Sequence, residues 1–204
     1  MGEEITVLLA DDQALVRGAM AALLSLERDI VVVGEVGSGD AVLDAARRLR
    51  PDVALLDIEM PGIDGIAATA LLTSELPTTR VLIVTTFARP GYLRRALQAG
   101  ARGFVVKDTP AAQLAEAVRR VHAGLRVVDP TLAAESVLSG SSPLTERESE
   151  VLRAARDGAP VATVATRVFL SEGTVRNHLS SAIGKTGATN RAEAVRVAED
   201  NGWL

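Results

Sequence analysis

Five short apolar runs, each followed by a segment with helical spacing, constrain the fold of this chain more than any other feature. The runs are rich in β-branched and aliphatic residues and do not alternate with polar ones, which is typical of strands covered on both faces. They occupy residues 5–10, 30–36, 53–57, 80–86 and 103–107. In the intervening segments apolar residues recur at three- and four-residue steps, as at Val16, Met20 and Leu23. The alternation predicts an α/β fold with a (βα)5 doubly wound parallel sheet.

The pattern changes after this region. Residues 124–143 contain two prolines and a Gly/Ser cluster that neither a strand nor a long helix would accommodate. No strand signal follows, and four helical segments are expected at about 145–157, 161–168, 172–186 and 190–201. We therefore predict an α/β domain at residues 1–123, a linker at 124–142 and a small all-α domain at 143–204.

The composition fits two packed domains, since the chain has 204 residues and is 48% hydrophobic. It has no cysteine, which excludes disulfides and thiol catalysis. The first residues lack a basic segment before their apolar run, and that run meets acids far short of membrane-spanning length. We expect a cytoplasmic protein without a membrane partner. The net charge of -4 neither indicates nor excludes binding to nucleic acid.

Three acids fall at the carboxyl ends of predicted strands. Asp11 and Asp12 follow the first strand, and Asp57 ends the third. In a doubly wound sheet these ends meet at one edge, so we expect the carboxylates to lie close together. Carboxylates so placed repel each other unless one is protonated or a cation lies among them, and oxygen ligands of this kind suit Mg2+. The alternative is that strand ends simply carry polar residues at the water boundary.

Two further polar residues end predicted strands. Thr85 lies at the end of the fourth strand and Lys107 ends the fifth. A lysine here can extend to solvent, but beside three acids and a cation it can also neutralise a phosphoryl group, to which a threonine hydroxyl can donate. Aspartate can act as a nucleophile and form an acyl phosphate. The set therefore predicts a phosphoryl-transfer site with Asp57 as the acceptor.

These residues resemble the receiver domain of two-component response regulators, a flavodoxin-like fold. The resemblance is carried by Asp11 and Asp12, by LLDIEMPGIDG around Asp57, by Thr85, and by Lys107 preceded by Phe104. It implies that Asp57 is the phospho-acceptor and that Mg2+ is held by Asp12 directly, by Asp11 partly through water, by Asp57 and by the backbone carbonyl of Glu59. It also implies that Thr85 and Phe104 occupy the switch positions. The implied partner is a sensor histidine kinase.

The helical tail contains two helices joined by a short turn near Leu170 and Ser171, as in a helix-turn-helix. On the second helix Val175, Leu179 and Ile183 recur at four-residue steps and should face the core. The DNA-contacting residues that we predict follow from this orientation. Arg176, Asn177 and Ser180 are expected to read base edges, whereas Thr174, His178 and Lys185 are better placed for phosphates or for packing.

The tail also resembles the LuxR-type helix-turn-helix in three segments, LTERESEVLR, SEGTVRNHLSSAIGK and NRAEAVRVAEDNGWL. Together the two resemblances indicate a NarL/FixJ-type response regulator. Residues 143–204 carry seven Arg and one Lys against eight Asp and Glu, so the predicted DNA-binding domain is formally neutral. We therefore expect a modest affinity for double-stranded DNA that a homodimer, formed on phosphorylation, must supplement.

Three other functions remain open at this point. A magnesium-dependent phosphohydrolase would use an aspartyl phosphate, but such enzymes usually carry a DxD motif, and Gln13 follows Asp11 and Asp12 here. A flavodoxin or Rossmann nucleotide site would need a glycine-rich loop where this chain has ADDQALVRG. A DNA-binding regulator that works without phosphorylation would usually lack one of the acids or the lysine. The prediction that the protein is not an enzyme rests on these contrasts.

Overall fold

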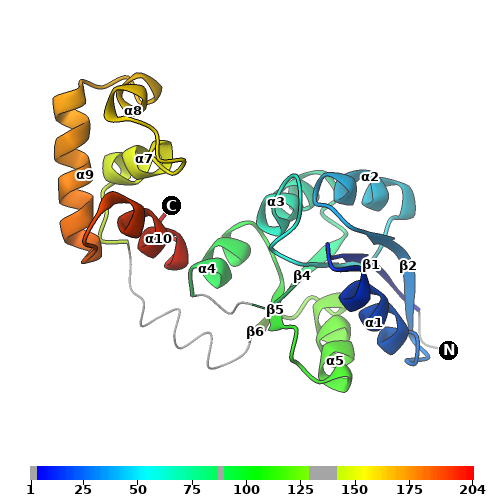
Figure 1. The fold of residues 1–204 in the computed structure, drawn as a ribbon. Helices are drawn as coiled ribbons and strands as arrows, with labels where there is room; N and C mark the ends of the chain where they lie inside the picture. The colour runs from blue at the N-terminus through cyan, green and yellow to red at the C-terminus, as the bar shows by residue number, and fades with distance from the viewer. Residues whose placement is uncertain (1–3, 87–89, 129–141) are drawn as a thin grey trace. The chain divides into compact units, whose positions relative to one another are not determined.

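The computed structural model describes residues 4–86, 90–128 and 142–204, with the side chain of Pro90 left aside (Figure 1). Most of the predicted linker therefore lies outside the described residues. The chain divides into two compact units, one built on a sheet and one built from helices. Among the described residues no helix combines the length and the apolar character needed to cross a membrane.

The sheet unit alternates strands and helices as predicted. The elements are β1 (Ile5–Ala10), α1 (Ala14–Leu24), β2 (Ile30–Val36), α2 (Asp40–Leu49), β3 (Val53–Leu56), α3 (Gly65–Glu75), β4 (Arg80–Thr85), α4 (Pro90–Gln98), β5 (Gly103–Val106), α5 (Ala111–His122) and β6 (Val127–Val128). All the strand pairings are parallel, and the strand order is β2-β1-β3-β4-β5-β6. The predicted doubly wound parallel α/β sheet is confirmed.

The sheet has one strand more than the five that were predicted. Val127 and Val128 pair with Gly103 and Phe104 of β5, although they fall in the range expected to be linker. Two residues are too few to show strand periodicity, and they are followed closely by a proline and a Gly/Ser cluster. The pairing with β5, rather than the local sequence, makes this segment a strand.

The strands are covered on both faces, which explains their continuous apolar sequence. Figure 1 shows α1 and α5 on one face of the sheet and α2 and α3 on the other. Along β1, Val7 and Leu9 join the core cluster that contains α1 and α5, whereas Leu8 between them points to the opposite face. Polar side chains of the central strands can therefore reach water only at the strand ends.

Two glycines shape the loop that follows β3. Gly62 has a φ of 81°, and a Cβ there would lie 1.7 Å from a carboxylate oxygen of Asp40. Gly65 begins α3 so close to the site that a Cβ would lie 1.9 Å from the backbone oxygen of Asp57. The side chain of Asp64 caps α3 by accepting from the Ala67 N–H at 2.6 Å. The loop can therefore turn tightly around the end of β3.

The second unit is all-helical, as predicted. Its helices are α7 (Glu146–Ala154), α8 (Val161–Arg167), α9 (Glu172–Thr186) and α10 (Arg191–Asp200). Thr145 and Glu148 form a capping box at the start of α7, and the side chains of Ser171 and Asn190 cap α9 and α10. Val151, Leu152, Val164 and Val175 are fully buried in the core of this unit. Trp203, the single tryptophan, packs against the same core.

The turn between α8 and α9 contains an unusual residue. Phe169 has a φ of 55°, in the left-handed region that favours glycine, and its side chain is 91% exposed. Its backbone N–H donates to the Thr166 oxygen at 3.4 Å, and the next N–H, of Leu170, donates to Ala165 at 3.0 Å. These bonds end α8, so the turn requires the strained conformation whichever residue occupies it.

Phe169→Gly should therefore stabilise the helical unit. Glycine removes the steric cost of the left-handed conformation, while its greater freedom in the unfolded chain offsets part of the gain. We expect the free energy of unfolding to rise by up to about 1 kcal/mol. The free energy of unfolding can be measured by urea denaturation, with the fluorescence of Trp203 as the signal. Phe169→Ala keeps a Cβ and is the matched control, and an equal gain in that variant would contradict the explanation.

Candidate functional site

The predicted acids meet at the carboxyl edge of the sheet. Asp11 and Asp12 directly follow β1, and Asp57 directly follows β3, the neighbouring strand. The three carboxylates each offer an oxygen, and these oxygens lie within 4.8 Å of one another. Asp11 and Asp57 are buried, whereas Asp12 is exposed. The prediction that the strand ends bring the three acids together is confirmed.

Lys107 follows β5 and reaches the same place. Its Nζ lies 2.7 Å from Oδ2 of Asp11 and 2.9 Å from Oδ2 of Asp57. The lysine side chain is 8% exposed, so the predicted alternative of extension to solvent does not occur. Its backbone N–H donates to the Thr85 oxygen at 2.8 Å, which holds the end of β5 against β4. One ammonium therefore bridges two buried carboxylates.

Burial and ion pairing shift the pKa values of Asp57 and Lys107 in opposite directions. Burial raises the pKa of the Asp57 carboxyl above its usual value, although the hydrogen bond from Lys107 lowers it in part. Burial alone would lower the pKa of Lys107, but its contacts with Asp11 and Asp57 outweigh this and raise that pKa. Lys107 therefore stays cationic, and its hydrogen bond and charge favour the ionised form of Asp57 against the effect of burial.

The acidic cluster has the donors that a metal ion requires. Oδ2 of Asp11 is buried and accepts no hydrogen bond of normal geometry, although it lies 2.7 Å from the Lys107 ammonium. Oδ1 of Asp11 accepts from the Gln13 N–H at 2.9 Å, and Oδ1 of Asp57 accepts from the Ile58 N–H at 2.7 Å. Each buried carboxylate thus holds one oxygen by a backbone amide and turns the other inward. Such a set of oxygens suits a hard divalent cation.

The remaining predicted residues of this site lie nearby in the sheet. Thr85 is the last residue of β4 and is buried, and Phe104 in β5 is fully buried. The register pairs Thr85 with Val106 and Ile83 with Phe104, so the hydroxyl and the ring lie on neighbouring strands. Glu59 lies two residues after Asp57, and its side chain is exposed. Its predicted contribution is the backbone carbonyl only.

One residue that supports the acids was not predicted from the sequence. A guanidinium nitrogen of Arg17, in α1, donates to the backbone oxygen of Asp11 at 2.5 Å, and another lies 3.4 Å from Glu35. This contact fixes the turn that carries Asp11 and Asp12. The spacing of Arg17 from Asp11 offered no signal, because the contact depends on how α1 packs beside β1 and β2.

The exposed face of α9 forms a second candidate site, an interface for nucleic acid. Val175 and Leu179 are buried and Ile183 packs against the core, as predicted. Arg176, Asn177 and Ser180 are exposed, which leaves them available to a ligand. Thr174 and His178 are half-buried on the flanks of the helix. In the structure Arg176 donates to Glu172 at 2.5 Å, so it must leave this partner to reach a base.

Lys185, the sixth predicted DNA contact, is exposed but forms an ion pair with a residue of the same helical unit. Its Nζ donates to Oε2 of Glu148 at 2.7 Å, and the Ser181 hydroxyl donates to Oε1 of the same residue at 2.6 Å. The Glu148 carboxylate also accepts from the backbone N–H of Thr145 at 2.7 Å and is buried. The contacts of Glu148 with Lys185 and Ser181 were not predicted from the sequence. The pairing of Glu148 with Lys185, across 37 residues, connects α7 to α9.

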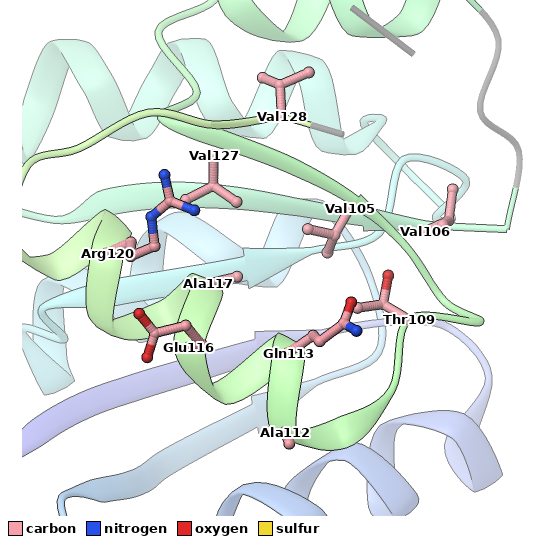
Figure 2. Close-up of a pocket in the computed structure, with 10 residues that line it drawn as sticks. All are labelled: Val105, Val106, Thr109, Ala112, Gln113, Glu116, Ala117, Arg120, Val127 and Val128. Carbon is pink, nitrogen blue, oxygen red and sulfur yellow. The ribbon is translucent and has the colours of Figure 1, made fainter. Parts of the chain in front are cut away.

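A separate pocket of about 340 Å³ lies between α5 and the β5–β6 edge (Figure 2). Its walls include Val105, Ala117 and Val127, and Glu116 and Arg120 are among its polar lining residues. None of the predicted phosphoryl-transfer residues lines this pocket. The chemistry-bearing side chains are therefore gathered at the carboxyl edge rather than in this pocket.

A parallel sheet with acids and a lysine at its carboxyl edge, joined to a helix-turn-helix unit, defines a class of signal-responsive regulators. The family model for the response regulator receiver domain matches residues 7–119, and the model for bacterial regulatory proteins of the luxR family matches residues 142–198. The chain belongs to the response regulators that join a receiver domain to a LuxR-type DNA-binding domain. Proteins of this family are transcriptional regulators.

Individual relatives match along nearly the whole chain. The transcriptional regulatory protein DesR of Bacillus subtilis is 41% identical over 202 residues, which cover 98% of this chain and 99% of that protein. The probable transcriptional regulatory protein NarL of Mycobacterium tuberculosis is 36% identical over 204 residues, which cover 96% and 94%. Both domains are therefore shared in the same order.

Solved structures agree with this assignment. The response regulator ChrA of a heme-sensing two-component system is 32% identical, with a TM-score of 0.60 and full coverage of both chains. RcsB from Salmonella enterica serovar Typhimurium, bound to promoter DNA in the presence of the phosphomimetic BeF3-, is 25% identical with a TM-score of 0.73 and covers 97% of this chain and 99% of that one. The predicted fold class and family are confirmed.

The ion pair between Glu148 and Lys185 should make the helical unit sensitive to acid. Burial alone would raise the pKa of Glu148. The hydrogen bonds from Lys185, Ser181 and Thr145 outweigh this and lower the pKa from 4.5 to about 2. Because this pKa is lower in the folded protein than in the unfolded chain, the ionised carboxylate stabilises the fold at pH values above about 4.5. This stabilisation is lost as the pH falls from about 4.5 towards 2. Glu148→Gln should lower the free energy of unfolding by about 1–3 kcal/mol at pH 7.

The difference in the free energy of unfolding between wild type and Glu148→Gln should become smaller as the pH falls from about 4.5 towards 2. Urea denaturation at a series of pH values, followed by Trp203 fluorescence, measures the difference. Glu150→Gln is the matched control, because Glu150 lies on the same helix and its carboxylate pairs with the exposed Arg147. A difference between wild type and Glu148→Gln that stays constant from pH 7 to pH 2.5 would show that the carboxylate does not act through its charge.

Proposed function

We propose that Asp57 accepts a phosphoryl group from a sensor histidine kinase and that this modification controls binding of the protein to promoter DNA. The observation that carries the proposal is the single ammonium of Lys107 that bridges Asp11 and Asp57 at 2.7 and 2.9 Å. A buried carboxylate so paired is held as an anion, oriented towards its neighbours, and surrounded by groups that can neutralise added negative charge.

The reaction needs few parts from the protein. An oxygen of Asp57 forms a bond to phosphorus as the phosphorus–nitrogen bond of a phosphohistidine breaks, and the imidazole leaves with a proton from solvent. Lys107 holds positive charge next to the oxygens that gain negative charge. The Ile58 N–H holds the other oxygen of Asp57 at 2.7 Å, so the reacting oxygen keeps a fixed orientation.

Asp11, Asp12 and Asp57, with the carbonyl of Glu59, would hold a magnesium ion. The inward-facing Oδ2 of Asp11 supports this assignment. When bound, Mg2+ would neutralise charge on the phosphoryl oxygens and the carboxylates. The exposure of Asp12 leaves room for the waters that this ion keeps.

Thr85 and Phe104 provide the proposed switch. Phosphorylation adds about -1.5 to -2 charges at the carboxyl edge, and the Thr85 hydroxyl can then donate to a phosphoryl oxygen. Movement of Thr85 at the end of β4 changes the space beside β5, where Phe104 is fully buried. A coupling of about 1–3 kcal/mol between the two positions suffices to change the population of an active state.

The output is binding of a homodimer to double-stranded DNA. Arg176, Asn177 and Ser180 are proposed to read base edges, with Thr174 and His178 beside them. Lys185 can contribute only by exchanging its bond to Glu148 for one to a phosphate. RcsB has been captured on promoter DNA in the presence of a phosphomimetic, and that arrangement in a related regulator supports the proposal for this chain.

A surface suited to dimerisation lies on α1. Its outward face is apolar, and Leu15, near the start of the helix, and Leu26, just after its end, are 86% and 79% exposed. Ala19, Ala22 and Leu23 lie between them and are also exposed. Such a face loses unfavourable contact with water when a second copy covers it.

We also propose a cytoplasmic location and keep the domain boundaries expected from the sequence. The receiver domain would end at residue 123 and the DNA-binding domain would begin at residue 143. The start of α7 at Glu146 is compatible with the second boundary, whereas the pairing of β6 with β5 extends the sheet beyond residue 123. A sensor histidine kinase and promoter DNA, the two proposed partners, would both meet the protein in the cytoplasm.

Asp57→Asn should leave the fold intact and abolish the response to phosphoryl donors. The amide cannot form an acyl phosphate, so acetyl phosphate with Mg2+ should add no phosphoryl group to the variant, as measured by intact-protein mass spectrometry. Light scattering should show donor-dependent dimers for wild type and none for the variant. Glu59→Gln is the control, because only the backbone carbonyl of Glu59 is assigned a role.

Dimerisation of Asp57→Asn in response to acetyl phosphate would contradict the proposal that phosphorylation of Asp57 controls dimerisation. Steady release of phosphate from a small phosphomonoester by wild type, but not by Asp57→Asn, would instead favour a phosphohydrolase. DNA binding that is equal with and without phosphorylation would favour the regulator that works independently of the modification.

Asn177→Ala should weaken binding to a DNA site selected with wild-type protein from random sequences. Loss of a bidentate contact to a base costs about 1–3 kcal/mol, which corresponds to an affinity at least about fivefold lower. Arg176→Ala should have a similar effect. Arg153→Ala, an exposed arginine on α7, is the control and should change the affinity by no more than about twofold. Equal losses for all three variants would indicate general electrostatics rather than base reading.

A further inference from the structure

The turn between β1 and α1 carries two of the three acids, and the sheet fixes the chain on the side where this turn begins. The Asp57 N–H donates to the Ala10 oxygen at 2.8 Å, and the Asp11 N–H donates to the Val36 oxygen at 3.1 Å. The carboxylate of Asp11 is held as well, since its Oδ1 accepts from the Gln13 N–H at 2.9 Å. The neighbouring strands therefore position the chain as far as Asp11.

Asp12, the next residue, has no comparable support from its own side chain. Its side chain is exposed, and its carboxylate forms no hydrogen bond or ion pair with the residues that the structure describes. Gln13, the N-cap of α1, makes no side-chain capping bond either. The direction of the Asp12 side chain is therefore set by the backbone of the turn, beginning with the planar peptide unit that joins Asp11 to Asp12.

Arg17, the fourth residue of α1, holds this turn on both sides of Asp12. Its Nη1 donates to the backbone oxygen of Asp11 at 2.5 Å, and its own backbone N–H donates to the Gln13 oxygen at 2.9 Å. The Asp11 carbonyl and the Asp12 N–H belong to one peptide unit, so the guanidinium sets the orientation of the bond that leads into Asp12. A hydrogen bond from a charged donor is stronger than one between neutral groups.

The bond between Arg17 and Asp11 is enclosed by protein. The Arg17 side chain is 20% exposed, and its Nε lies 3.4 Å from the carboxylate of Glu35 in β2. Gly37, directly after β2, lies beside the same contact, since a Cβ there would be 3.4 Å from Nη1 of Arg17 and 4.0 Å from the Asp11 oxygen. Asp11 is fully buried, so its carbonyl depends on a protein donor.

We propose that Arg17 is a positioning residue for the divalent cation, because it keeps the Asp12 carboxylate where an ion can share it with Asp11 and Asp57. The inference rests on the magnesium site proposed above. Oxygens of the three acids lie within 4.8 Å of one another although the Asp12 carboxylate has no bond of its own among the described residues, so the backbone must place it.

The charge of Arg17 acts against this positioning role. A guanidinium beside a cation site repels the ion, so its charge alone would weaken the binding of Mg2+. Removal of Arg17 should therefore strengthen Mg2+ binding if only its charge matters, and weaken binding if its hydrogen bond to Asp11 matters more. The sign of the change distinguishes the two effects.

Titration of the isotope-labelled full chain with MgCl2, followed by the amide NMR signals of Asp12 and Gln13, tests the proposal. Arg17→Met keeps an apolar stem but has no donor, and its dissociation constant for Mg2+ should be about tenfold higher than that of wild type. Arg17→Lys keeps a charged donor and should recover part of the affinity. Arg48→Met makes the same chemical change at an exposed position in the last turn of α2 and should leave the affinity within about twofold of wild type.

Phosphorylation by acetyl phosphate gives a second measurement, which separates positioning from general damage to the site. In Arg17→Met the Mg2+ concentration that gives half the maximal rate should rise about tenfold, while the rate at saturating Mg2+ should change by less than about twofold. A lower maximal rate without a shift in the half-saturating concentration would overturn the proposal.

Three outcomes of the titration would also overturn the proposal, and they differ in what else they exclude. Mg2+ binding by Arg17→Met that is as tight as in wild type, or tighter, would show that the hydrogen bond to Asp11 does not position the ligand. A loss in Arg48→Met equal to that in Arg17→Met would show that the effect does not depend on this contact. The absence of saturable Mg2+ binding by wild type would overturn the proposed magnesium site itself, and the inference with it.

Discussion

The contact between the Lys107 ammonium and the carboxylates of Asp11 and Asp57 is the interaction on which the site depends. Two carboxylates buried a few ångströms apart repel strongly, and water cannot screen them there. The single cation at 2.7 and 2.9 Å makes both charges tolerable and keeps Asp57 available for its proposed role as a nucleophile. Without it the burial that raises the pKa of Asp57 would favour the protonated, unreactive form.

This contact requires that three strand ends arrive together. The central strands are apolar on both faces, so a charge can be accommodated only where each strand ends. The order β1-β3-β4-β5 places the ends that carry Asp11, Asp57, Thr85 and Lys107 in sequence across four adjacent strands. Gly65 lets α3 begin directly against the backbone of Asp57, where any side chain would collide with it. The apolar strands therefore determine the sheet, and the polar residues at their ends determine the acidic site.

The periodicity of the apolar residues made most of the fold and of the acidic site predictable from the sequence. Strand and helix patterns, the acids at strand ends and the buried face of α9 all follow from residues close together in sequence. The features that were missed depend on distant partners. Val127 and Val128 become a strand only because β5 offers its edge, and Lys185 finds Glu148 across 37 residues. Likewise, the left-handed backbone of Phe169 follows from how α8 ends, since its sequence contains no glycine to mark the turn.

The two edges of the sheet differ in a way that the helices help to explain. Crossover helices begin near the carboxyl ends of the strands, so their positive ends favour a phosphoryl anion beside Asp57, and their negative ends favour cations at the opposite edge. This effect accounts for the presence of arginines at the amino-terminal edge. The register places Arg102 and Arg126 on one face of the sheet and Arg80, which pairs with Val53, on the other, so these cations are spread over both faces of the edge rather than gathered at one site.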